Sequence, residues 1–184
     1  MGSSVTDKCI TATYDYRDES GVSLYQVLRF QPKAFRQRRL DGRDGWIYNL
    51  DGTRRVLYRL QELLRADPGD VVFLAEGEKD VDRLTYDLGL VATTCPMGAN
   101  AWRDEYSHFL NDRRVVILPD NDPTGRRHAK AVARSLIAAG ALEIKILELP
   151  GLSAKGDVSD WLDSGGTKRQ LLELAAKTSA LTPG

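Results

Sequence analysis

The first third of the chain alternates between apolar and polar residues in a way that predicts β-strands. Residues 11–17 and 23–30 are alternating runs, and the five residues between them include Gly21, so they predict a hairpin. A third short run, residues 46–50, is followed by an Asp-Gly turn signal. We therefore expect one small antiparallel sheet in this part of the chain.

The pattern changes after residue 65. Residues 57–65 carry leucines at helical spacing, and the Ala-Asp-Pro-Gly sequence that follows predicts a chain break. Beyond the break, short β-branched runs alternate with helical periodicity, which is typical of a mainly parallel sheet flanked by helices. The predicted strands are residues 71–75, 91–94, 114–118 and 143–149. The predicted helices are residues 79–88, 101–110, 125–139, 159–162 and 168–176.

Together these patterns predict an α/β protein with two parts. Residues 5–68 form a small, basic, β-rich subdomain, and residues 69–180 form the domain of alternating strands and helices. The opening Met-Gly-Ser-Ser has the character of a cloning remnant and predicts no structure.

The composition is that of a globular protein. The chain has 184 residues, 42% of them hydrophobic, and 26 basic against 26 acidic side chains, so its net charge indicates no particular partner. The two cysteines lie far apart without metal-binding spacing, which favours reduced thiols and excludes a structural zinc site. Because the chain has no long apolar run and no signal-peptide pattern, we expect a cytoplasmic protein with no membrane partner.

Two of the predicted strands end at carboxylates. Glu76 follows the run at residues 71–75, and Asp120 and Asp122 follow the run at residues 114–118. The carboxyl ends of parallel strands meet at one edge of a sheet, so these three side chains are expected to converge there. Oxygen ligands of this kind suit a hard divalent cation, Mg²⁺ or Mn²⁺.

These acids also have structural explanations. Asp80 lies near the start of a predicted helix, where an acid is favoured without any metal. The Asp-Asn-Asp-Pro sequence at residues 120–123 makes turns, although repulsion between its two aspartates favours a cation between them. Asp157 follows the last predicted strand and is a candidate ligand of the metal. Its neighbours Ser159 and Asp160 are candidates for the cap of the next helix instead.

Between residues 29 and 59 the chain carries nine basic residues and only three acidic ones. Aromatic residues are interleaved with them. A surface that follows phosphates and stacks bases has this composition. A solvated basic face explains the same residues equally well, so both interpretations stay open.

Three motifs in a fixed order resemble the Toprim domain of primases, topoisomerases, small nucleases and recombination proteins. They are strand-Glu76-Gly77, strand-Asp120-x-Asp122-x-x-Gly125 and Gly156-Asp157-x-x-Asp160-Trp161-Leu162. The resemblance covers residues 71–162 and implies a compact, Rossmann-like domain with a four-stranded parallel sheet. It implies that Glu76 acts as general base or acid and shares the divalent metal with Asp120 and Asp122. Asp80 and Asp157 would be accessory acids of the same metal site.

The preceding part resembles the basic subdomain of bacterial-type primases, especially the compact cores of phage and plasmid primases and primase-helicases. Arg29, a Pro32-Lys33 pair and a Leu57-Tyr58 motif with basic neighbours occur in the family's order, while residues 34–39 depart from its commonest pattern. The resemblance implies that basic side chains bind nucleic acid or nucleotide. These side chains are Arg29, Lys33, Arg36, Arg38, Arg54, Arg55 and Lys79.

The two resemblances imply a DNA primase catalytic core that joins ribonucleoside triphosphates into short RNA primers on single-stranded DNA, with Mg²⁺ or Mn²⁺ as cofactor. Metal ions organise the triphosphate in such a nucleotidyl transfer. Two alternatives stay open: a Toprim-type metal-dependent nuclease, and a non-catalytic nucleic-acid-binding module of a replicative helicase. A helicase or helicase domain is a candidate partner. The chain has no counterpart of a zinc ribbon or a P-loop, and we expect a fragment of a larger replication protein.

Overall fold

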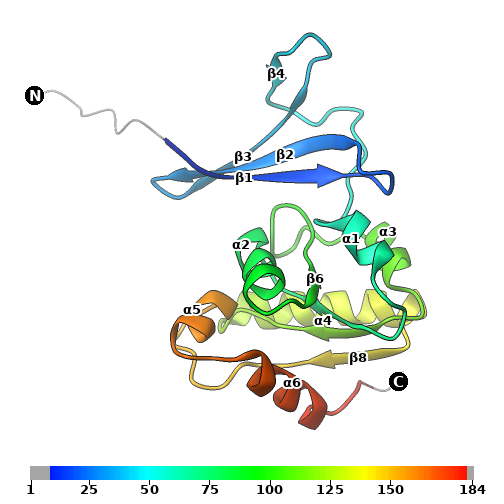
Figure 1. The fold of residues 1–184 in the computed structure, drawn as a ribbon, viewed down its shortest axis with the longest axis vertical. Coiled ribbons are helices and arrows are strands. Elements are labelled where there is room, and N and C mark those ends of the chain that lie inside the picture. Colours follow the sequence, from blue (N-terminus) through cyan, green and yellow to red (C-terminus); the bar gives the residue numbers. More distant parts are fainter. Residues whose placement is uncertain (1–8, 182–184) are drawn as a thin grey trace, which may run out of the picture.

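The computed structural model describes residues 9–181, so the opening Met-Gly-Ser-Ser and the first four residues of the predicted N-terminal part lie outside the described residues. Two four-stranded sheets dominate the fold. Figure 1 shows the antiparallel sheet stacked above a unit in which helices surround the parallel sheet. The predicted fold class, a β-rich part followed by a parallel sheet flanked by helices, is confirmed.

The antiparallel sheet has the strand order β1-β2-β3-β4. β1 (Cys9–Arg17) and β2 (Ser23–Gln31) form the predicted hairpin, and its loop holds Gly21 at φ 87°, a conformation that favours glycine. The sequence pattern misses β3 (Ala34–Leu40), because this strand is rich in arginine and has no buried residue to give an apolar alternation. β4 (Trp46–Ile47) has two residues, so the strand predicted at residues 46–50 is too long.

The parallel sheet has the strand order β6-β5-β7-β8. Its strands are β5 (Val71–Leu74), β6 (Val91–Thr93), β7 (Arg114–Ile117) and β8 (Glu143–Ile146). Val72 of β5 pairs with Val91 on one side and with Val115 on the other. All four strands lie where the sequence predicts them, each ending one to three residues earlier. The central pair, β5 and β7, is largely buried, as continuous apolar runs predict.

The helices follow the predicted order with local differences, one of which is that the helix predicted from residue 101 begins at Asp104. They are α1 (Leu60–Arg65), α2 (Glu78–Asp82), α3 (Asp104–Ser107), α4 (Pro123–Ala138), α5 (Val158–Asp163) and α6 (Lys168–Lys177). A π-helical turn, η1 (Arg83–Asp87), continues α2, and a 3₁₀ turn, η2 (His108–Leu110), continues α3. α1 begins at Leu60 rather than at residue 57, because the backbone of Tyr58 bonds to the Thr94 carbonyl and the Thr93 hydroxyl instead.

One hydrophobic core joins the two layers. Tyr16 and Tyr25 of the antiparallel sheet stack with their ring centroids 4.6 Å apart, and they belong to the same buried cluster as Phe73 of β5. The Tyr16 hydroxyl also donates a 2.8 Å hydrogen bond to Glu78 at the start of α2. The predicted division at residue 68 therefore separates two parts that share a core, and it stays a prediction.

Two further expectations concern a membrane-spanning helix and the two cysteines. No helix within residues 9–181 is long and apolar enough to cross a membrane. Cys9 is exposed and Cys95 is buried, and both are free thiols.

Candidate active site

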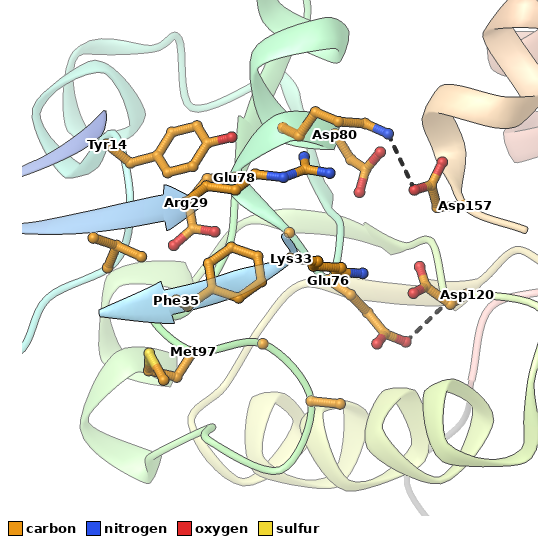
Figure 2. A pocket seen from close by; sticks show the side chains of 15 residues that line it. Tyr14, Arg29, Lys33, Phe35, Glu76, Glu78, Asp80, Met97, Asp120 and Asp157 are labelled. Carbon is orange, nitrogen blue, oxygen red and sulfur yellow. Dashed lines mark hydrogen bonds and ion pairs between the residues drawn. The ribbon is translucent and has the colours of Figure 1, made fainter. Parts of the chain in front are cut away.

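A cavity of about 230 Å³ lies between the antiparallel sheet and the carboxyl ends of β5 and β7. Figure 2 shows three of its carboxylates, Asp80, Asp120 and Asp157, grouped away from the apolar side chains of Phe35 and Met97. The cavity therefore has an acidic side supplied by the parallel unit and an apolar side that includes a residue from the antiparallel sheet.

Glu76 ties the ends of the two central strands together. Its Oε1 accepts a 3.1 Å hydrogen bond from the backbone N–H of Asp120. Gly125 packs tightly beside it, since a Cβ there would meet the Glu76 carboxylate and would lie 2.6 Å from the carbonyl oxygen of Asp120. Burial raises the pKa of Glu76, and the charges of Asp122 and Asp80 raise it further. A carboxyl group with a raised pKa exchanges a proton more readily near neutral pH, as a general acid or base must.

Asp120 is the most strongly perturbed carboxyl group of the cavity. Burial raises its pKa to about 8, together with the negative charges of Glu76, Asp80, Asp157 and Asp122. No donor within residues 9–181 makes a hydrogen bond to the Asp120 carboxylate, so none offsets this repulsion. Its ionised form therefore lacks a positive partner at neutral pH.

The other three predicted acids have structural partners. Asp122 caps α4, where its Oδ1 accepts a 2.8 Å hydrogen bond from the Gly125 N–H, and it does not line the cavity. Asp157 caps α5 in a capping box with Asp160. Asp80 is buried and accepts bonds from the hydroxyl and the N–H of Ser159, at 2.5 and 3.1 Å. The N-cap of α5 is thus Asp157 itself rather than Ser159 or Asp160, with Asp160 as its capping-box partner. Asp80 lies in the first turn of α2, where the sequence predicts that an acid is favoured without any metal.

The donor set of the cavity fits a hard divalent cation. The acidic side chains supply oxygen ligands only, which suits Mg²⁺ or Mn²⁺, and a cation would relieve the repulsion around Asp120. As the side chains lie, no three acidic, histidine or cysteine groups in the described part of the chain are close enough together to hold a metal ion. The predicted ligand set therefore stays a prediction, and Asp122 is its one member that does not line the cavity.

The structure divides the seven predicted basic residues among several places. Arg29, Lys33 and Lys79 line the cavity, and the Lys79 Nζ lies 3.3 Å from the Asp157 carboxylate. The guanidinium of Arg54 forms a two-point ion pair with Glu19 at 2.6 and 2.8 Å.

The three remaining basic residues lie outside this cavity. Arg55 donates to the carbonyls of Leu50 and Thr53 and lines a different cavity. Arg36 is exposed on β3, and Arg38 on the same strand bonds to Gln26 and lies 3.8 Å from the ring centroid of Trp46. Three of the seven predicted basic residues thus line the same cavity as the acidic residues.

Sequence reasoning missed three side chains of the cavity. Tyr14 of β1 and Phe35 of β3 line it, and so does Glu78, whose pKa is raised by burial and lowered in part by the Tyr16 hydrogen bond. The Glu-Gly-Glu spacing could have drawn attention to Glu78. Phe35 is one of the aromatic residues interleaved with the basic ones, and Tyr14 carries no signal. The sequence could not assign either of them to this cavity, because their place depends on how the two layers pack.

No protein-family model matches the chain, and no curated protein matches it. Solved structures with a similar fold do exist. The primase fragment of the bacteriophage T7 primase-helicase has a TM-score of 0.64 at 20% identity, over 88% of this chain and 60% of that one. The Aquifex aeolicus primase, with its zinc-binding and RNA polymerase domains, has a TM-score of 0.68 at 20% identity, over 92% and 40%. The Escherichia coli primase catalytic core has a TM-score of 0.65 at 18% identity, over 92% and 52%.

The chain therefore has the fold of bacterial and phage primase catalytic cores. The similar structures cover most of this chain, including both sheets, so the predicted resemblance is confirmed at the level of the fold. The chain spans 60% of the length of the T7 fragment and 40% of the Aquifex protein.

Proposed function

We propose that the chain is the catalytic core of a DNA primase and joins ribonucleotides into short primers on single-stranded DNA. The proposal rests on the cavity, in which five acidic residues of the parallel unit adjoin Arg29, Lys33 and Lys79 within a primase-type fold. Two proteins of similar fold were solved with nucleic acid, one with single-stranded DNA and one with an RNA/DNA hybrid and dTTP. These ligands support a similar substrate class for this chain.

The residues of the cavity suit nucleotidyl transfer. Glu76, Asp80, Asp120 and Asp157 would hold Mg²⁺ or Mn²⁺, which stabilises the attacking and leaving oxygens of an in-line displacement at phosphorus. Glu76 has one oxygen fixed by the Asp120 N–H and a raised pKa, so it is suited to take the proton of the attacking hydroxyl.

The basic side chains of the cavity have a complementary task. Arg29 and Lys33 would neutralise the triphosphate from the side of the antiparallel sheet, while the ion pair with Asp157 positions Lys79 near the acids.

The broader setting follows by analogy. The T7 structure belongs to a primase-helicase, and we extend the proposal to a helicase or helicase domain as partner, in phage or plasmid replication. Addition of a helicase on a forked template would raise primer yield if this extension is right.

Primer synthesis tests the proposal. The protein is incubated with single-stranded DNA, labelled ribonucleotides and Mn²⁺ or Mg²⁺, and new oligonucleotides and cut template are resolved on one gel. We expect short labelled products that fall by at least about 100-fold in Glu76→Gln, because general acid–base catalysis contributes about 10²–10⁴-fold. Arg169→Gln, which removes a charge that is 85% exposed on α6, serves as the control and should act like the wild type. Cut template without synthesis would instead establish a nuclease.

A further inference from the structure

A second cavity of about 340 Å³ lies next to the acidic one and is basic. Met97 lines both cavities, so the loop that carries it separates them. The lining of the second cavity includes Arg55, Trp102, Arg103 and Tyr106. Two arginines and no carboxylate in this lining give the second cavity the opposite charge from the first.

Trp102 is held in place in the second cavity. Its indole N–H donates a 3.0 Å bond to the Ser107 hydroxyl, which lies 2.8 Å from the Ser135 hydroxyl. Ser135 in turn donates to Asp104 at 2.6 Å. The ring also packs edge-on against Tyr106 at 5.7 Å between centroids. This partly buried tryptophan therefore has a fixed orientation, as a stacking platform for a base requires.

The charges of the second cavity are neutralised only in part by the described residues, because Arg103 has an ion pair and Arg55 has none. Arg55 donates through a single nitrogen to the carbonyls of Leu50 and Thr53, and Arg103 is 52% exposed with one ion pair, to Glu105 at 3.3 Å. Burial raises the pKa of Tyr106 to about 12, while the charges of Arg103 and Arg55 act to lower it, so both guanidinium groups lie near this phenol. The Tyr106 hydroxyl is buried and has no hydrogen-bond partner within residues 9–181.

The loop between the cavities is shaped by unusual backbone angles. Met97 and Asn100 have φ values of 71° and 68°, and Gly98 between them has 67°. Side chains other than glycine adopt this region rarely, so the surrounding structure must hold the loop in this shape. The N–H of Asn100 donates to the buried His128 at 3.2 Å, which anchors one end of the loop to α4. Met97 therefore has a fixed position on the boundary between the two cavities.

We propose that the second cavity binds one nucleotide unit of the single-stranded nucleic acid, with its base on Trp102 and its phosphate between Arg55 and Arg103. The inference rests on the proposed function, because it places this unit beside the nucleotide in the acidic cavity. The ligand is a single strand rather than a free nucleotide, because the cavity combines an aromatic platform with two arginines and directly adjoins the acidic cavity.

Binding without catalysis tests this assignment. A fluorescein-labelled oligothymidylate is titrated with protein in EDTA at several salt concentrations, and anisotropy reports the Kd. We expect Arg103→Gln to weaken binding by about 3–10-fold and to reduce the salt slope by about one, as for the loss of one phosphate contact. Trp102→Leu should weaken binding by about 5-fold or more with less change in the slope. Arg169→Gln loses the same charge on the far helix α6 and should bind like the wild type.

The outcomes separate this inference from the proposed function. Equal Kd values for Arg103→Gln, Trp102→Leu and Arg169→Gln would overturn the second site, even if the wild type makes primers. A wild type that binds no oligonucleotide would overturn it as well, and so would variants that weaken only ATP binding. Weakened strand binding in the two variants, with no primers from the wild type, would support the site and contradict the primase. A melting curve of each variant excludes unfolding as the cause.

Discussion

At the scale of single residues, Asp120 shows how the fold concentrates negative charge. Its partly buried carboxylate accepts no hydrogen bond from any described residue, and the negative charges of four other acids act on it. Its pKa of about 8 lies above the ordinary value of 3.8, so the folded protein binds a proton that the unfolded chain has released between these two pH values. Stability without a cation must therefore fall as the pH rises from 4 to 8.

Asp120→Asn should remove this pH-dependent loss of folding stability. In EDTA we expect the variant to be more stable than the wild type at pH 8 by roughly 1–2 kcal/mol, after allowance for solvent screening, and nearly equal to it at pH 4. Urea unfolding at the two pH values measures the difference. A variant that is less stable than the wild type at pH 8 would mean that Asp120 has a structural partner.

Site residues could be predicted from the sequence where the topology of the sheet determines their position, and not where their position depends on tertiary packing. Glu76 and Asp120 were predictable, because strand ends of a parallel sheet converge at one edge. The cavity position of Phe35 and the capping of α4 by Asp122 were not. The position of Phe35 depends on how the two layers pack. The local sequence around Asp122 is compatible both with a metal ligand and with a helix cap.

At the level of the elements, hydrogen bonds between Ser159 and Asp80 join α5 to α2 beside the acidic cavity. The Ser159 hydroxyl donates to the buried carboxylate of Asp80, so the helix that carries Asp157 at its cap is fixed relative to β5 and α2. Burial raises the pKa of Asp80, and the nearby charge of Asp157 adds to this, whereas the Ser159 bonds lower it.

Ser159→Ala leaves Asp80 buried with one donor fewer. We expect a loss of about 1–3 kcal/mol in the free energy of unfolding, the usual cost of removing a partner from a buried polar group. Ser164→Ala removes an exposed hydroxyl bond to the Asp160 carbonyl near the end of the same helix and should change stability by less than about 0.5 kcal/mol. Urea denaturation of both variants checks this, and equal losses would show that the Ser159–Asp80 bond carries no special weight.

The elements themselves were largely predictable where burial imposes a pattern. β5 and β7 have apolar runs because they lie in the middle of a covered sheet. β3 escaped prediction because its arginines and glutamine leave no apolar face, although backbone pairing with β2 stabilises it. The π-helical turn η1 could not be read from residues 83–87, since its side chains show no pattern that distinguishes it from an α-helix.

At the scale of the whole molecule, the antiparallel sheet closes the acidic cavity and shares the core of the parallel unit. The stacked Tyr16 and Tyr25 rings and the Tyr16–Glu78 hydrogen bond join the two layers. Two parts that share a buried core lose contacts together when either unfolds.

Unfolding should therefore be one cooperative transition. We expect urea curves followed by tryptophan fluorescence and by far-UV circular dichroism to coincide, and Tyr16→Phe to lower the midpoint while keeping a single transition. The expected cost is about 1–3 kcal/mol, because the buried Glu78 loses its hydroxyl donor. Two separate transitions would instead support independent domains divided at residue 68.

The central claim is that the acidic cavity holds the divalent cation needed for nucleotidyl transfer, and direct binding of Mn²⁺ tests it. Electron paramagnetic resonance of free Mn²⁺ gives the Kd for the wild type, Asp120→Asn and the control Arg169→Gln. We expect the wild type and the control to bind Mn²⁺ alike, and Asp120→Asn to bind it at least about 10-fold more weakly, a loss of about 1.4 kcal/mol. Equal Mn²⁺ binding by Asp120→Asn and the wild type would contradict the claim.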